Sequence, residues 1–102
     1  MARQVTIGRT VLYRLTAEDA HAINRSLVKG MPEDSRVADV NIGNPERAGS
    51  ILPMVVVRVW PDAFGRDPSV NGQVLLDGNG VMWVQSVSEG AEPGQWHWPE
   101  MV

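Results

Sequence analysis

The sequence predicts a mainly β fold, a small SH3-like antiparallel barrel or curled sheet of about five strands with one α-helix. Ten glycines and seven prolines in 102 residues indicate many turns and short elements. Only one stretch has helical periodicity, and short glycine-containing turns join the later apolar stretches, which favours antiparallel hairpins. The alternative is an α+β roll. The length is that of a single domain, residues 1–102.

The first strand and the helix are predicted in the N-terminal third. Within residues 5–15, alternation predicts a strand with one face made of Val11, Tyr13 and Leu15. The following segment TAED has the N-cap threonine and the acid of a capping box, and apolar residues then recur at helical spacing. Because Gly30 and Pro32 are typical of a helix end, we expect the helix to span about 17–29.

The segment from residue 31 to residue 50 has no clear periodicity. We expect a long loop there, with room for one short edge strand. Loops of this length in small domains tend to be functional, mobile or ordered by a partner.

The remaining strands are predicted after residue 50. The strongest is ILPMVVVRVW, residues 51–60, where simple alternation assigns Val55, Val57 and Val59 to one face and to the other Met54, Val56, Arg58 and Trp60. Residues 73–76 and 81–87 predict a hairpin around DGNG, and one face of its second arm would carry Val81, Trp83, Gln85 and Val87. The final stretch QWHW, residues 95–98, predicts a short strand with both tryptophans on one face and His97 opposite.

Charge and composition exclude several classes of protein. The net charge is −3, and all nine basic residues lie between Arg3 and Arg66, whereas only acids follow. This balance argues against general nucleic-acid binding, which needs a basic surface. The chain has no cysteine, which excludes disulfides and thiolate sites and fits a reducing cytoplasm. Its longest apolar run is far too short to span a membrane, so we expect a cytoplasmic protein with no membrane partner.

Motifs for catalysis or for a cofactor are missing from the sequence. There is no HExxH, GxSxG, GxGxxG or Walker motif, and no pair of acid and base at a recognisable spacing. The segment DGNG lacks the further ligands of a calcium loop and is explained by a β-turn. We therefore expect no metal, no cofactor and no enzymatic activity.

Aromatic residues provide the candidate site. The four tryptophans are either core residues or a platform on which a flat ring could stack. Arg58 shares a strand face with Trp60, and an arginine beside an aromatic ring suits a ligand with a ring and an anion. The predicted ligand-binding residues are Trp60, Arg58, Trp96, Trp98, His97 and Arg47.

Four stretches of the chain carry a family resemblance: IGRTVLYRLTAEDAHAIN, LPMVVVRVW, VNGQVLLDGNGVMWVQSV and GQWHWPE. With them, the chain resembles a family of small uncharacterised proteins of tailed phages and prophages. The resemblance implies a phage or prophage origin and an accessory role, and it implies no activity.

Two functions are compatible with these observations. The first is a non-enzymatic binding module that sequesters a host nucleotide immune signal at a site lined by tryptophan and arginine. The alternative is an SH3-like protein-protein interaction module that binds a host protein or a virion component through an aromatic groove and an exposed strand edge. The basic first part and acidic last part of the chain would also allow complementary packing in a homo-oligomer.

Overall fold

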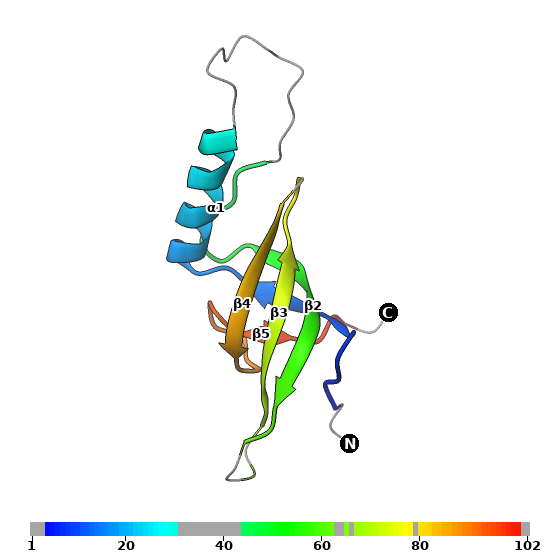
Figure 1. The fold of residues 1–102 in the computed structure, drawn as a ribbon. Coiled ribbons are helices and arrows are strands. Elements are labelled where there is room, and N and C mark those ends of the chain that lie inside the picture. The colour runs from blue at the N-terminus through cyan, green and yellow to red at the C-terminus, as the bar shows by residue number, and fades with distance from the viewer. Residues whose placement is uncertain (1–3, 31–43, 63–64, 66, 79, 101–102) are drawn as a thin grey trace.

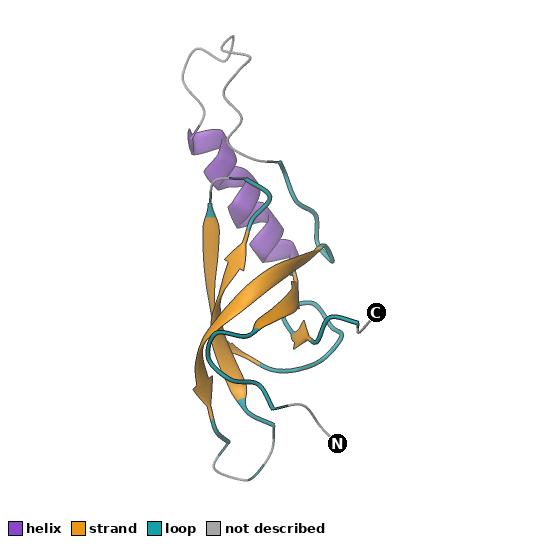
Figure 2. Ribbon diagram, turned by 90° about the vertical axis from the view of Figure 1, so that its right-hand side faces the viewer, coloured by secondary structure: helices purple, strands orange, loops and turns teal. Residues whose placement is uncertain are grey.

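The computed structural model describes residues 4–30, 44–62, 65, 67–78 and 80–100. Its described part is one five-stranded antiparallel sheet with one helix, which confirms the predicted fold class (Figures 1 and 2). The sheet has the strand order β4-β3-β2-β1-β5 and is open. The elements are β1 (Thr10–Arg14), α1 (Ala17–Gly30), β2 (Ile51–Trp60), β3 (Ser69–Leu75), β4 (Val81–Val87) and β5 (Trp96–His97).

The sheet curls around the long central strand β2. The first half of β2 pairs with β1, and its second half pairs with β3. In Figure 1, β2, β3 and β4 form the front of the molecule, while β1 and β5 cross behind them. A single sheet therefore supplies both walls around the core, as the prediction of a curled sheet requires.

The helix begins with the predicted capping box. The Asp19 amide donates to the Thr16 hydroxyl at 2.9 Å, and the Thr16 amide donates to the Asp19 carboxylate at 3.0 Å. The same carboxylate accepts a hydrogen bond of 2.6 Å from the hydroxyl of Tyr13 on β1. Burial and this hydrogen bond to a negative group both raise the pKa of Tyr13 above its ordinary value.

Two element boundaries differ from the prediction. The first strand begins at Thr10 rather than near residue 5, because residues 7 and 8 form a turn, in which Gly8 has a φ of 92°, and both Gly8 and Arg9 hydrogen-bond to Val56. The third strand begins at Ser69, four residues before the expected start. Of the predicted 31–50 loop, residues 31–43 lie outside the described part. Residues 44–50 are irregular, and their Glu46 backbone forms two hydrogen bonds with the side chain of Asn24 on α1.

The faces of β2 also differ from simple alternation. The register of β2 against β3 shifts by one residue between Val56 and Arg58. Met54 and Val56 are buried, whereas Arg58 and Trp60 are exposed on the outer face, so the prediction that these four residues share a face is wrong. Val57 is the extra residue of a bulge, and an extra residue reverses the direction of every side chain after it.

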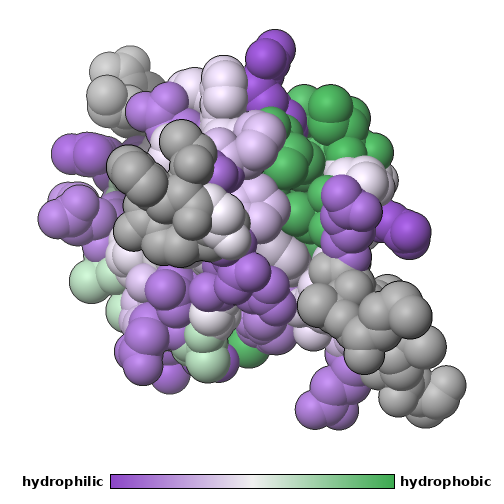
Figure 3. Space-filling view, turned by 90° about the horizontal axis from the view of Figure 1, so that it is seen from below, coloured by the Kyte–Doolittle hydropathy of each residue, from purple (hydrophilic) through white to green (hydrophobic). Residues whose placement is uncertain are grey.

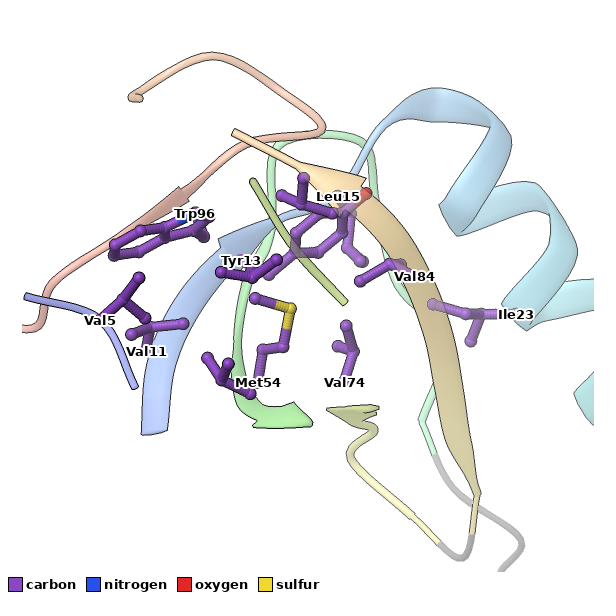
Figure 4. Packing of buried hydrophobic residues seen from close by; sticks show 12 residues of the cluster. Val5, Val11, Tyr13, Leu15, Ile23, Met54, Val74, Val84 and Trp96 are labelled. Atoms are coloured by element: carbon purple, nitrogen blue, oxygen red, sulfur yellow. The ribbon is translucent and has the colours of Figure 1, made fainter. Parts of the chain in front are cut away.

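The core lies between the two walls of the curled sheet (Figure 4). It collects the inward residues of all five strands, with Val5 and the helix residue Ile23 closing its sides. Gly72 is required on β3 because an added Cβ would lie 2.5 Å from the side chain of Met54.

No described helix is long and apolar enough to cross a membrane.

Candidate binding cleft beside Trp60

The predicted site residues of the last strand lie in or against the core. Trp96 is only 2% exposed, and Figure 4 shows its ring beside Val5 and Val11. Trp98 is half-buried and packs edge-on against Trp96, with ring centroids 5.4 Å apart and an interplanar angle of 86°. Trp96 therefore belongs to the core, Trp98 packs against it, and Trp96 offers no surface to a ligand.

His97 occupies the opposite side of the same strand. It pairs with Leu12 of β1 and is half-buried. Among the described residues, no group donates to or accepts from its buried Nδ1 atom. The described residues also contain no cluster of three or more histidine, aspartate or glutamate side chains that could hold a metal ion.

Arg47 lies at the other end of β2 from Trp60. It is exposed in the turn before the strand, where its carbonyl accepts a hydrogen bond from the Ser50 amide. Because β2 has ten residues, the two ends are separated by up to about 30 Å along the strand. The structure does not bring Arg47 to the same site as Trp60.

Arg58 and Trp60 do form a pair, as predicted. The Arg58 guanidinium carbon lies 5.0 Å from the centroid of the Trp60 ring, a cation–π contact. Both side chains are exposed, and Trp60 is 45% exposed. The β2 bulge is the reason that this pair faces outward instead of entering the core.

An open cleft of about 560 Å³ lies beside Trp60. It is formed where β2 ends, where β3 begins and where β4 ends. Its lining consists of one aromatic ring, one proline, three serines and three acids: Trp60, Pro61, Asp62, Asp67, Ser69, Ser86, Ser88 and Glu89. None of these lining residues is basic, so the formal charge of the lining itself is negative, while the exposed guanidinium of Arg58 lies 5.0 Å from the Trp60 ring.

A second bulge shapes the rim of the cleft. The register of β4 against β3 shifts so that Gln85 and Ser86 together face Asn71. Ser86 has a φ of 55°, in the left-handed region that non-glycine residues seldom adopt. Its amide donates to the Asn71 side-chain oxygen at 2.9 Å, which holds the bulge in place.

Apolar side chains are also exposed outside the cleft. Val57, Leu75, Val81 and Trp83 lie on the outer sheet face and are each at least 40% exposed, and Ile7 precedes β1 with 69% exposure. Viewed from the end at which the N-terminus lies, apolar side chains gather on one side of the molecule, while the rest of that view is largely polar (Figure 3). Such a patch is typical of a surface that meets another macromolecule.

Sequence reasoning identified Trp60 and Arg58 but missed the acids and serines of the cleft. The sequence signal that points to these acids is the charge asymmetry, since Asp67 and Glu89 lie after Arg66, in the part of the chain where no basic residue accompanies the acids. Comparison with protein-family models, with curated proteins and with solved structures finds no match to this chain.

Proposed function

We propose that this protein is a non-enzymatic interaction module that binds a positively charged segment of a partner protein in the cleft beside Trp60. The observation that supports this most directly is the lining itself, which combines an exposed indole with the carboxylates of Asp67 and Glu89. An indole face attracts cations, and carboxylates pair with arginine or lysine. Arg58 already occupies a position over the Trp60 ring, as an arginine of a partner could do on another part of this indole.

The shape of the cleft favours a segment of a protein over a small molecule. Pockets for small ligands usually enclose most of the ligand and are largely apolar. This cleft is open and polar, and other exposed apolar side chains lie on the outer face of the same sheet. Following the phage resemblance of the sequence, we propose a host protein or a virion component as the partner.

Nucleotide sequestration is the second candidate, and the Arg58–Trp60 pair favours it. A base could stack on the indole while a phosphate meets the guanidinium. The carboxylates of Asp67 and Glu89 oppose this function, because they would repel phosphate groups placed in the cleft.

Calorimetric titration with three kinds of ligand distinguishes the two candidates. We expect binding of a short peptide rich in arginine and proline, no binding of a glutamate-rich peptide, and no binding of linear or cyclic nucleotides. Affinity for the basic peptide should fall as salt is raised, because the paired charges are exposed to solvent.

Matched variants locate the binding surface. Trp60→Leu should weaken binding of the basic peptide at least tenfold, whereas Trp83→Leu should not change it, because Trp83 is similarly exposed but lies outside the cleft. The double change Asp67→Asn and Glu89→Gln should also weaken binding, and Glu92→Gln is its control. Nucleotide binding that Trp60→Leu abolishes would instead establish the second candidate, and equal effects of the two tryptophan variants would contradict both.

A further inference from the structure

The outward edge of β4 has unpaired backbone groups. In an antiparallel ladder, residues whose N–H and C=O groups face the neighbouring strand alternate with residues whose groups face away. The backbone of Val56 forms hydrogen bonds with Gly8 and Arg9, on the β1 side of β2. The backbone groups of the preceding residue, Val55, therefore face β3, where its partner is Gln73. Gly72 and Val74 of β3 then face β4, and their partners there are Val84 and Met82.

Three residues of β4 therefore direct their backbone groups away from the sheet: Val81, Trp83 and Gln85. No backbone hydrogen bond to these three residues is present from the other described loops and turns. Their side chains stand on the outer face and are exposed, with Val81 at 60% and Trp83 at 53%.

This edge lacks the features that usually prevent strand pairing. The strand VMWVQSV has no charged residue and no proline, and its β propensity is high. Proteins normally protect an edge strand with lysine, proline, a cover or a very short length. The opposite edge of this sheet, β5, has only two residues, and the backbone of its Trp96 is hydrogen-bonded to Ser88 and Gly90 after β4, so that edge is covered. The described loops and turns form no such bonds with β4.

We propose that β4 pairs with β4 of a second copy of this chain, in an antiparallel arrangement about a two-fold axis at Trp83. In this register Trp83 faces the partner's Trp83, Val81 faces the partner's Gln85, and Gln85 faces the partner's Val81. These three residue pairs form six backbone hydrogen bonds, which is the largest number that the outward groups of Val81–Gln85 can make. The bulge at Gln85 and Ser86 sets the end of the paired region.

A second copy fits this edge for two reasons. The pattern of outward groups is symmetric about Trp83, so one two-fold axis satisfies every group on both strands. The uncharged strand also meets its copy without repulsion between like charges, and it places two indoles side by side as a stabilising cross-strand pair. The contact uses the same surface on both copies, which gives a closed dimer rather than a fibre.

The dimer is independent of the proposed cleft. None of Val81, Trp83 and Gln85 lines it. Loss of dimerisation with intact peptide binding, or the reverse, would therefore separate failure of one proposal from failure of the other.

Sedimentation equilibrium of the full chain over a range of concentrations tests the proposal. We expect a monomer–dimer equilibrium that reaches twice the chain mass of 11.2 kDa. Trp83→Pro should weaken association at least tenfold and leave the fold intact, because it removes an N–H that faces away from β3 and edge strands tolerate proline there. If Trp83→Pro unfolds, Trp83→Lys decides instead, because it places two positive charges opposite each other at the axis.

Val57→Lys is the matched control, since Val57 is exposed on the same face but belongs to the middle of the sheet. It should remain a dimer. The proposal is overturned if the protein is monomeric at every concentration, if the folded Trp83 variant still dimerises, or if only Val57→Lys dissociates the dimer. In the dimer, amide hydrogen exchange should be slowed at residues 81, 83 and 85, and unchanged exchange there would also contradict the proposed register.

Discussion

Replacing each tryptophan by leucine separates those that stabilise the core from those that form a surface. Trp96 is 2% exposed, Trp98 is half-buried, and Trp60 and Trp83 are 45% and 53% exposed. If burial decides the cost, Trp96→Leu should lower the free energy of unfolding the most and Trp83→Leu the least. The four variants differ in position alone, since the chemical change is the same.

The expected magnitude follows from the area that each ring removes from water. A fully buried tryptophan covers about 150–250 Å², which is worth about 4–6 kcal/mol at roughly 25 cal/mol per Å². Leucine recovers about half of this, and the remaining cavity adds to the loss, so Trp96→Leu should cost about 3 kcal/mol. Trp98→Leu should cost about 1–2 kcal/mol, because part of that ring is already in water. Trp60→Leu, and Trp83→Leu at concentrations at which the chain is monomeric, leave no cavity and should each cost less than about 1 kcal/mol.

Urea denaturation followed by far-ultraviolet circular dichroism measures the series, because this signal comes mainly from the backbone and the midpoint does not depend on its amplitude. A domain of this size typically has about 5–15 kcal/mol of stability, so a loss of 3 kcal/mol gives a large shift of the midpoint. Equal midpoints for Trp96→Leu and Trp60→Leu would refute the assignment of Trp96 to the core. If Trp96→Leu stays fully folded but loses a binding activity, the WHW segment belongs to a binding site.

Three further changes test the packing and the electrostatics. Gly72→Ala should lower stability by about 1–3 kcal/mol, measured by the same denaturation, because its Cβ would overlap with the buried side chain of Met54. Stability should fall as pH rises above about 10, because the unfolded chain then releases the tyrosine proton while the raised pKa of Tyr13 keeps that proton bound in the folded protein. Urea midpoints measured between pH 8 and 11 should show this decline, and Tyr13→Phe should remove the part that is due to Tyr13. Asn71→Ala should cost about 1 kcal/mol and speed amide exchange at Ser86, and unchanged exchange would show that the bulge does not depend on this hydrogen bond.

The sequence was sufficient for the fold class because local signals agree with the tertiary structure there. The capping box of TAED places the start of the helix, and its two reciprocal hydrogen bonds are present. Strand alternation correctly predicted that Val11, Tyr13 and Leu15 share one face, and all three are buried in the core. The start of β3 was missed because residues 69–72 include asparagine and glycine, which favour turns, and only the pairing with β2 and β4 makes them a strand.

The candidate site was predicted less well, because its residues are brought together by tertiary structure alone. The pair of Arg58 and Trp60 depends on a two-residue spacing within one strand, so sequence reasoning could find it. The partners Asp67 and Glu89 come from connections at the ends of two other strands, and no spacing rule joins them to Trp60. Trp96 was assigned to a candidate site on its unusual neighbours, yet its burial depends on how the sheet closes.

Both bulges of the sheet occur at the same level of β3, and together they account for the position of the cleft. Opposite Asn71, β2 inserts Val57 on one side, and β4 inserts an extra residue at Gln85 and Ser86 on the other. Without the first bulge, the alternation of β2 would direct Trp60 into the core. Without the second, the outer-face alternation of β4 would continue to Val87, which is instead buried. A bulge also increases the local twist of a strand. Here the inserted residues lie near the ends of β2 and β4, next to the acids of the cleft. The exposed indole and the cleft are thus products of two inserted residues rather than of the alternating pattern that builds the core.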